Sequence, residues 1–509
     1  MFKKVKIDFL IIYTLTLSIF VPLKFVLFPN LFGEDEVLTY LINIEVMNSL
    51  KDFDIKSIFI HLLKDWHPPG RNILPVIPLM IFSQEIYVSR FVYLIFWVLS
   101  ALLAVQISRN ISNKFSGFVC VSLIFGSGLY HIQILSFGIV LVTFLGLVII
   151  WLLLKKCNEN LINDKLYINL MIVCFIGFLF FNTFLLILIG INFLVIYQIL
   201  FLKQDNKFSL KKYIILASFF AILYIIYYCI FIVMPFLITH SPSFINLLTY
   251  FFGELNFGNW DGKPFGQYHQ YIYRSETSEF NYLPLINNLK YLNWHFLPFL
   301  GPSILILGIF MMFKEYKNIF FIFLPFLVTM NFYIQGRSMA HFVSYVIWSI
   351  PFFCLIFQNK LFERFISRFL VIISISIVFS YSYLFHIKTY DENTYRYDLV
   401  KKLFGLYIWP SNIKRPLEEI SNLVKENSNL NDKMIYSIDG SLVKYYLKDY
   451  NFKKINIDDI SKISNSQECK KFKDIKIYIT DNSKIKPCQN IILKKHSFSG
   501  SNIVVYQFN

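Results

Sequence analysis

Long apolar runs separated by short polar segments fill most of the chain up to about residue 388. A helix needs about 20 mostly apolar residues to cross a bilayer, so each run is a candidate span. The pattern predicts roughly eleven membrane-spanning helices and a mainly α, polytopic fold. The predicted spans are residues 8–29, 88–108, 115–131, 133–154, 166–181, 183–202, 213–236, 294–313, 318–335, 340–357 and 369–386.

The stretch after Arg71 is ambiguous, because it is apolar but short and contains Pro75 and Pro78. It fits either a crossing or a surface helix. If it does not cross, all the later basic clusters lie on the cytoplasmic side, and if it crosses, all of them lie outside. We therefore predict that it does not cross. These clusters are Arg109 and Lys114; Lys155, Lys156 and Lys165; Lys203, Lys207, Lys211 and Lys212; Lys314 and Lys317; Lys360, Arg364 and Arg368.

Charge also orients the chain. Lys3, Lys4 and Lys6 place the N-terminus in the cytoplasm, and an odd number of spans then places the C-terminal part outside. The same topology puts two large loops outside, residues 30–87 and 237–293.

Residues 389–509 differ in composition from the rest, with many Lys, Asn, Asp and Ser residues. We predict a transmembrane domain at 1–388 and a small soluble extracytoplasmic α/β domain at 389–509. The strand-like runs are 433–439, 475–480 and 503–508, and the helix-like runs are 417–425 and 441–448.

Composition agrees with a membrane protein: 56% of residues are hydrophobic, 19% are aromatic and the mean hydropathy is +0.55. The formal charge of +16 does not indicate a nucleic-acid partner, because the basic residues are scattered between apolar runs. The first run has no small-residue cleavage site after it, so we expect it to be retained.

The cysteines show no CxxC or metal-ligand spacing. Cys120, Cys174, Cys229 and Cys354 lie in apolar runs and are predicted to be inert core residues. Cys469 and Cys488 lie in the predicted extracytoplasmic domain, where a disulfide between them stays an open alternative.

The first outer loop carries two polar motifs. Glu34, Asp35 and Glu36 follow the first span directly, and the sequence Asp65-Trp66-His67-Pro68-Pro69 comes about thirty residues later. Charge is costly in hydrocarbon, so three carboxylates at a membrane edge suggest work done there. Between the motifs, six apolar residues fall on one helical stripe and predict a helix lying in the interface: Ile55, Ile58, Phe59, Leu62, Leu63 and Trp66.

This motif pair resembles the bacterial relatives of protein O-mannosyltransferases and the RgtA-type and aminoarabinose transferases, which are integral-membrane glycosyltransferases of the GT-C class. The resemblance covers roughly residues 1–115, and the rest matches only in its span pattern. It implies a GT-C fold in a bacterial inner membrane and a polyprenyl-phosphate sugar donor. The acceptor would be an envelope glycan, lipid or protein.

The resemblance and the acidic triplet together suggest an inverting transfer. Phosphate on the anomeric carbon is already a good leaving group, so one base is sufficient. Asp35 is the candidate base that takes the proton from the acceptor hydroxyl. Glu36 would hold the acceptor or orient Asp35, and Glu34 is an alternative base. The competing interpretation is three solvated acids at the positive end of an interfacial helix.

Basic residues near the outer face are candidates for the donor phosphate. His67 stands where the family places a basic residue ahead of proline, and its alternative is a helix-terminating surface histidine. Asp65 would set the tautomer of His67 or face water. Arg90 matches an arginine common in the family, and its alternative is snorkelling at the interface.

Other candidates are weaker. Arg337 and His341 correspond loosely to an Arg-Tyr pair of the family, and Lys263 and Arg274 lie among aromatic residues that suit sugar stacking or interfacial anchoring. The Arg-x-Tyr that many relatives carry early in the fourth span is missing from Ser136–Val140, so the donor would be held differently or would itself differ. With no convincing second acidic cluster, we predict no obligatory metal, and a divalent cation stays an alternative.

Two other functions compete with the enzyme. A lipid-linked-sugar flippase needs polar or charged groups well inside several spans, whereas these spans are mostly Phe, Leu and Ile. A non-catalytic GT-C scaffold that only binds glycolipid is the third hypothesis.

Overall fold

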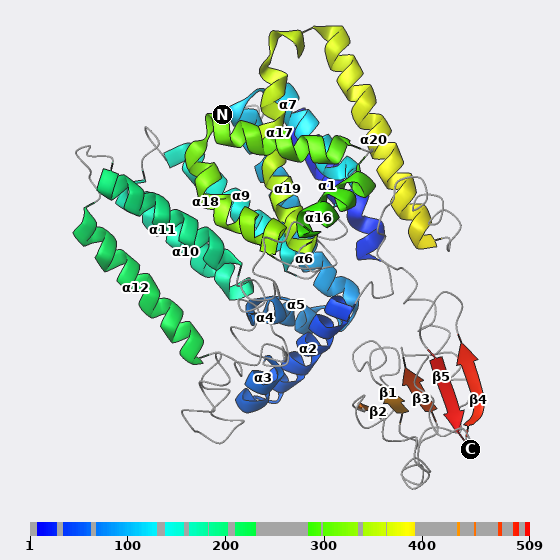
Figure 1. Cartoon of the computed structure of the whole chain (residues 1–509). Coiled ribbons are helices and arrows are strands. Elements are labelled where there is room, and N and C mark those ends of the chain that lie inside the picture. Colours follow the sequence, from blue (N-terminus) through cyan, green and yellow to red (C-terminus); the bar gives the residue numbers. More distant parts are fainter. Residues whose placement is uncertain are drawn as a thin grey trace, which may run out of the picture. The chain divides into compact units, whose positions relative to one another are not determined.

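The computed structural model describes the chain in segments. These are residues 8–27, 34–62, 68–129, 138–156, 162–181, 183–201, 209–230, 283–296, 299–333, 339–362 and 364–391, and five strands at 435–437, 452–454, 477–480, 492–497 and 504–508. The chain divides into two compact units, one of Met1–Phe28 and Ile42–Ile408, the other of Pro29–Leu41 and Trp409–Asn509. The described part of the first unit is helical (Figure 1).

Each predicted span falls on one helix of the first unit. Their bounds are α1 (Phe9–Val26), α6 (Ile86–Ile111), α7 (Lys114–Gly126), α9 (Ile139–Lys156), α10 (Asp164–Phe180), α11 (Phe184–Phe201), α12 (Leu210–Tyr228), α17 (Leu300–Glu315), α18 (Lys317–Val328), α19 (Met339–Phe353) and α20 (Phe365–Asp391). Two short 3₁₀ helices, η4 (Cys354–Gln358) and η5 (Lys360–Phe362), connect α19 to α20. Among the described helices, α6, α11 and α12 are long and apolar enough by themselves to cross a membrane. The total number of crossings stays a prediction.

The predicted span 294–313 begins too early. A separate helix, α16 (Leu283–His295), takes up its first two residues, and α17 starts only at Leu300. Phe299 between them has a positive φ of 69°, and its N–H donates to Asn293 Oδ1 (3.0 Å). Pro298 in this connection cannot continue a helix. The hydropathy pattern missed the break because both sides of it are apolar.

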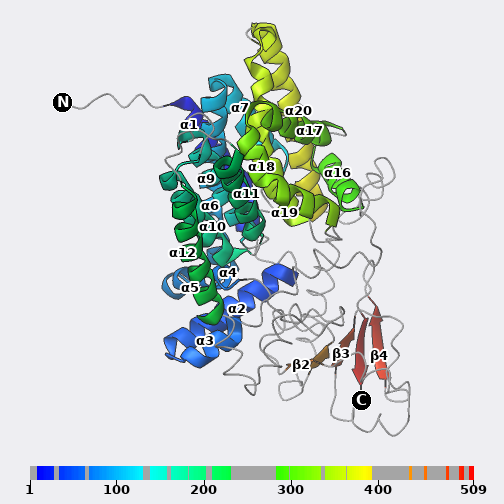
Figure 2. The ribbon, with the colours of Figure 1, turned by 60° about the vertical axis from the view of Figure 1, so that its left-hand side comes forward.

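The ambiguous stretch after Arg71 forms two short helices, α4 (Gly70–Ile73) and α5 (Val76–Ile81). At 1.5 Å per residue, twelve residues of helix span about 18 Å, well short of the roughly 30 Å hydrocarbon core. The stretch is therefore too short to cross as one helix. Figures 1 and 2 show α4 and α5 at one end of the bundle with α3 (Ile55–Leu62). We call this the α4 end.

The predicted interfacial helix is found as α3 over Ile55–Leu62, and its continuation over residues 63–67 lies outside the described residues. A second helix, α2 (Glu34–Lys51), begins at the acidic triplet. The turn between α2 and α3 holds Phe53 at a φ of 54°, and Asp54 Oδ1 accepts the N–H of Ser57 (3.0 Å) to cap α3. A polar loop with its own helices thus follows the first span.

At the opposite end, ion pairs, a hydrogen bond and a ring contact link the start of α1 to three connections of the bundle. Asp8, just before α1, contacts Arg109 (2.6 Å) and Lys114 (3.0 Å) at the α6–α7 turn. Ser116 donates to the carbonyl of Cys354 (3.2 Å), where α19 ends. The ring of Tyr316, between α17 and α18, lies against Phe352 of α19. We call this the basic end, and its assignment to the cytoplasm stays a prediction.

The described strands of the second unit form one sheet in the order β2-β1-β3-β5-β4. The bounds are β1 (Ile435–Ser437), β2 (Phe452–Lys454), β3 (Ile477–Thr480), β4 (Ile492–Ser497) and β5 (Val504–Phe508). β2, β1 and β3 run parallel, and β5 is antiparallel to both β3 and β4. β1, β3 and β5 lie in the three predicted runs, whereas β2 and β4 were missed because their lysines hide the alternation. The predicted helices at 417–425 and 441–448 lie outside the described residues, so the α/β domain and the boundary at 389 stay predictions.

The prediction that the cysteines of the apolar runs are core residues is wrong for one of them. Cys120, Cys174 and Cys354 are buried, but Cys229 is exposed. It follows α12, whose apolar side chains are largely exposed, as expected for a helix that faces lipid. Cys469 and Cys488 lie outside the described residues, and their pairing stays open.

Candidate active site

A junction of helix ends surrounds α4, directly after the Pro-Pro sequence of the second motif. A Cβ atom on Gly70 would lie 2.4 Å from the carbonyl oxygen of Leu179, at the end of α10. Only glycine allows this approach, so the residue after Pro68-Pro69 lets α4 dock directly on the backbone of α10. Pro68 itself is buried.

Arg71 follows and is held by two more helices. The hydroxyl of Tyr93 on α6 donates to the backbone carbonyl of Arg71 (2.9 Å). Gly138, immediately before α9, has a φ of 97°, and a Cβ there would meet Cβ of Arg71 at 3.2 Å and the ring of Phe181 at 2.6 Å. Arg71 is therefore wedged between α6, the start of α9 and the end of α10, and it is only 3% exposed.

Arg90 lies beside this junction. It is the fifth residue of α6 and one turn before Tyr93, so the two side chains share a face of that helix. Arg90 is completely buried, which does not fit the alternative in which it snorkels to the bilayer surface. Tyr93 thus places the turn that carries Arg90 against α4.

Arg71 and Arg90 are the only buried charged residues among those whose side chains are described. An arginine stays protonated at any ordinary pH, and a buried charge is costly unless negative groups or hydrogen-bond acceptors surround it. Two such residues at one helix junction make the α4 end a site suited to an anion.

Two buried hydroxyl groups flank the arginines. Ser89 precedes Arg90 on α6, and Thr183 follows Phe181, whose ring lies beside Gly138 and Arg71. Within the described chain, neither Ser89 Oγ nor Thr183 Oγ1 has a hydrogen-bond partner. Buried hydroxyls are nearly always bonded, so these two are candidate donors to a bound ligand.

Most other predicted site residues cannot be placed in this geometry. Glu34, Asp35 and Glu36 form the first turn of α2, but their side chains are not described. His341 lies near the start of α19, also without a described side chain. The remaining candidates lie outside the described residues: Asp65, His67, Lys263, Arg274 and Arg337. Of the predicted set, only the side chain of Arg90 is placed.

Sequence analysis missed Arg71 as a site residue. It was noted only as the residue before the ambiguous apolar stretch, because an arginine after prolines resembles an ordinary surface residue. Its position directly behind a glycine that permits close backbone contact was the available clue. Burial of Arg71 depends on α6, α9 and α10, which the local sequence does not reveal.

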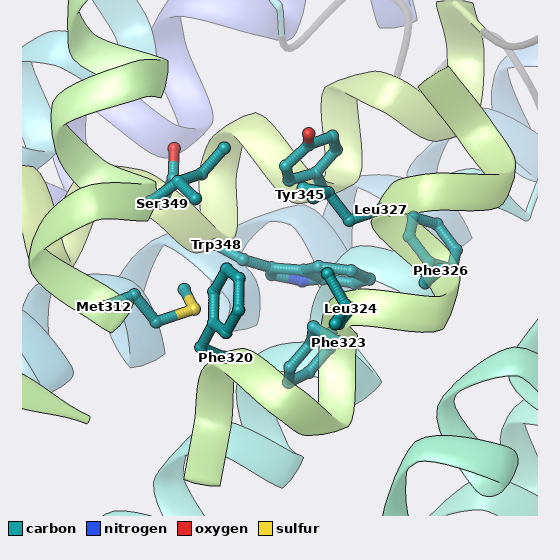
Figure 3. A pocket seen from close by; sticks show the side chains of 10 residues that line it. Met312, Phe320, Phe323, Leu324, Phe326, Leu327, Tyr345, Trp348 and Ser349 are labelled. Atoms are coloured by element: carbon teal, nitrogen blue, oxygen red, sulfur yellow. The ribbon is translucent and has the colours of Figure 1, made fainter. Parts of the chain in front are cut away.

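A small cavity between α17, α18 and α19 is not a substrate site. It is lined by apolar side chains around Trp348 and by Tyr345 and Ser349 (Figure 3). Its volume of about 20 Å³ accommodates about one water molecule. The described residues include no group of three or more His, Cys, Asp or Glu side chains that could hold a metal ion. The structure leaves the metal prediction untested, because the side chains of residues 34–36 are not described.

Comparison with solved structures shows that this helical bundle shares the fold of GT-C membrane glycosyltransferases. The crystal structure of ArnT from Cupriavidus metallidurans in the apo state matches with a TM-score of 0.56, over 97% of each chain and at 9% identity. ArnT is an aminoarabinose transferase.

Two other structures agree. ArnT from the same organism bound to undecaprenyl phosphate matches with a TM-score of 0.53 and 9% identity, over 98% of this chain and 96% of that one. The apo oligosaccharyltransferase of Archaeoglobus fulgidus matches with a TM-score of 0.51 and 12% identity, over 92% of this chain and 69% of that one. No protein-family model matches the chain, and no curated protein matches it. The resemblance inferred from the motifs is thus confirmed as a shared fold.

Proposed function

We propose that this protein is an inverting glycosyltransferase that moves a sugar from a polyprenyl-phosphate-linked donor to a cell-envelope acceptor at the outer face of the bacterial inner membrane. The buried pair Arg71 and Arg90 carries the proposal. Guanidinium groups bind phosphate oxygens in bidentate geometry, and a dry site strengthens that attraction. The undecaprenyl phosphate bound to ArnT supports this donor class.

In this proposal the arginines hold the phosphate, and the departing polyprenyl phosphate takes the negative charge that they stabilise. Asp35 is the base that accepts the proton of the acceptor hydroxyl while the oxygen attacks the anomeric carbon from the face opposite the phosphate. Glu36 orients Asp35 or holds the acceptor. No metal is required, since Arg71 and Arg90 already supply two positive charges.

The topology that goes with it has about eleven spans, with the N-terminus in the cytoplasm and residues 389–509 outside. The α4 end then faces outward and the basic end inward, as the positive-inside rule requires. His67, three residues before Gly70, would reach the same compartment as Arg71.

The position of the buried charges favours an enzyme over a flippase. Arg90 is the fifth of 26 residues in α6, so about 6 Å of helix precede it. A transporter places charged groups near the bilayer midplane. Among the described residues the deeper interior holds neutral groups that are bonded to one another, such as Thr143 with Ser344.

Replacing Asp35 by Asn tests the proposal. Cells that lack the gene are complemented with wild type, Asp35→Asn or Asp52→Asn, and their envelope glycans are compared by mass spectrometry. Asp52 is an exposed carboxylate of the same loop and serves as the matched control. We expect Asp35→Asn to lose the modification, by a factor of about 10² or more, and Asp52→Asn to keep it.

Binding of undecaprenyl phosphate to the purified proteins completes the test. Wild type and Asp35→Asn should bind it equally, since the base does not touch the phosphate. A wild type that does not bind undecaprenyl phosphate would refute the donor class. An Asp35→Asn variant that still modifies the envelope would refute the base and favour a transporter or a binding scaffold.

A further inference from the structure

A buried polar cluster joins α16, α19 and the end of α18. Asn331 lies in η3 (Thr329–Tyr333), a π-helical turn that ends α18. Its Nδ2 donates to the carbonyl of Leu327 (2.8 Å) and to the hydroxyl of Tyr345 on α19 (2.9 Å). Its Oδ1 accepts from Asn288 Nδ2 on α16 (3.2 Å). All three side chains are buried, and π-helical turns inside α-helices occur frequently at functional sites.

The cluster connects to the arginine junction through α19 and α9. Ser344, next to Tyr345, accepts a hydrogen bond from Thr143 Oγ1 (2.8 Å), and Trp348 Nε1 donates to the carbonyl of Thr143 (2.9 Å). Thr143 is in the second turn of α9, which starts directly after Gly138, the residue packed against Arg71. A continuous set of contacts therefore runs from Asn331 to Arg71.

A small cavity adjoins α19 at this level. The cavity that Tyr345 and Trp348 line leaves a gap on the α17–α18 side, and side chains beside a gap lose dispersion contacts there. Figure 3 shows the hydroxyl group of Tyr345 pointing away from the indole of Trp348. Its bond to Asn331 is thus a directional restraint that a phenylalanine in the same place would not supply.

The basic end contains a near copy of this cluster. Asn192 on α11 donates through Nδ2 to the carbonyl of Leu188 (2.8 Å). Its Oδ1 accepts from the hydroxyls of Tyr167 (2.8 Å) and Tyr213 (3.1 Å). Asparagine bonds between membrane helices stabilise a bundle wherever they occur, so both clusters contribute to folding. The two clusters differ in their distance from Arg71: Thr143 lies five residues from Gly138 along α9, whereas Tyr167 lies twelve residues from Leu179 along α10.

We infer that Tyr345 and Asn331 are positioning residues for the donor phosphate: through Ser344, Thr143 and Gly138 they hold the start of α9 where Arg71 meets its ligand. This rests on the function proposed above, because the phosphate of the donor is the ligand that reports the position of Arg71. The Asn192 cluster also bonds an asparagine to tyrosine hydroxyls, which here donate instead of accepting, and it serves as the comparison.

Tyr345→Phe and Tyr167→Phe are the matched pair that tests the inference. Each change deletes one buried hydroxyl that is bonded to an asparagine, and each should lower the melting temperature of the full-length protein to a similar degree. We expect Tyr345→Phe to weaken binding of undecaprenyl phosphate about fivefold, which is the size of one hydrogen bond. Tyr167→Phe should change it by less than about twofold.

A double-mutant cycle separates positioning from stability. In an Arg71→Lys background, Tyr345→Phe should have little further effect on binding, since it acts through Arg71. If Tyr345→Phe does not accumulate as folded protein, Ser344→Ala, which breaks the α9–α19 link, takes its place in the cycle.

The outcomes are distinct. If wild type does not bind undecaprenyl phosphate, the proposed function fails and the inference fails with it. If wild type binds, and Tyr345→Phe binds as tightly as Tyr167→Phe, the inference alone is overturned. Additive losses in the Arg71→Lys cycle would also overturn it, because they would mean that Tyr345 acts independently of Arg71.

Discussion

The two ends of the helical bundle carry positive charge in opposite ways. At the basic end, Arg109 and Lys114 contact Asp8 with side chains that are 42% and 55% exposed. At the α4 end, Arg71 and Arg90 are 3% and 0% exposed. The first arrangement is common on protein surfaces, whereas arginines are rarely fully buried.

The difference suggests separate roles: the exposed charges orient the protein in the membrane, and the buried arginines bind a ligand. Exposed ion pairs contribute little to stability and are screened by salt, so the basic end needs no function beyond marking one side of the membrane. Burial of a guanidinium group is expensive without compensating partners, and such groups gather at functional sites. Counting charges along the sequence treats both ends alike, and only burial distinguishes them.

The largest expected effect comes from removing the buried charges. Arg71→Leu and Arg90→Leu should each weaken binding of undecaprenyl phosphate by about 100-fold, since loss of a buried charged hydrogen bond costs about 2–4 kcal/mol. Arg109→Leu, at the basic end, should leave binding unchanged. Binding titrations of the purified proteins in nanodiscs measure this.

Lysine variants check whether the geometry of the arginines matters. Arg71→Lys and Arg90→Lys keep the charge but lose bidentate binding, so they should fall between wild type and leucine. If all variants that stay folded bind like Arg109→Leu, the buried arginines serve the fold alone and the comparison between the ends loses its functional meaning.

An intermediate effect is expected from the turn that supports Arg71. Gly138→Ala forces a Cβ into a positive φ and against Phe181 and Arg71, which should cost about 1–2 kcal/mol in stability and move Arg71. Thermal unfolding and undecaprenyl phosphate binding should therefore both weaken.

Gly117→Ala is the control for this change at the basic end. There a Cβ would come too close only to the tip of the Leu10 side chain (2.7 Å), which can turn away, and would make an ordinary contact with Val105 (3.6 Å). Binding should stay at the wild-type level. Equal losses of binding in the two alanine variants would show that the α4 end does not bind undecaprenyl phosphate specifically.

The smallest expected effect is a difference in acid sensitivity between the two ends of the bundle. A hydrogen bond from Lys114, aided by the backbone N–H of Leu10 and by Arg109, holds the pKa of Asp8 below its usual 3.8. A lowered pKa means that the stabilisation is present at neutral pH and is lost as the pH falls through the lowered value. The protection of the amides at residues 8–12, measured relative to their intrinsic exchange rates at each pH, should thus fall below about pH 4.

Arg71 and Arg90 do not titrate in this range, so amides around α4 should keep their protection until the bundle itself opens. Asp8→Asn should show the acid behaviour at neutral pH. If acid removed amide protection around α4 before it did so around α1, Asp8 would not be the group whose titration destabilises the bundle.

Much of the fold was predictable from the sequence because apolar runs determine membrane helices. The breaks inside such runs were not, as at Phe299, because a helix end between two apolar segments leaves the hydropathy profile unchanged. Pro75 and Pro78 were recognised as interruptions, and only the lengths of α4 and α5 show that this stretch is too short to cross as one helix.

The candidate site was predictable only in part. Arg90 was named from the motif resemblance, whereas Arg71 needed the tertiary contacts of Gly70, Tyr93 and Gly138 to become visible. Asn331 lies in a predicted span, and a polar residue in an apolar run is itself a reason to look for a partner. Its partners Asn288 and Tyr345 are too distant in sequence for a local pattern to indicate them.

The short helices α4 and α5 also bear on how the chain is inserted into the membrane during synthesis. The insertion machinery accepts a segment when it is long and apolar enough, and Ile73 to Phe82 contains no charged residue. Leucines in place of Pro75 and Pro78 would offer it a longer continuous helix. If that segment were inserted as an extra crossing, every later helix would have the opposite orientation in the membrane. Pro75 and Pro78 therefore help to fix the orientation of the whole bundle.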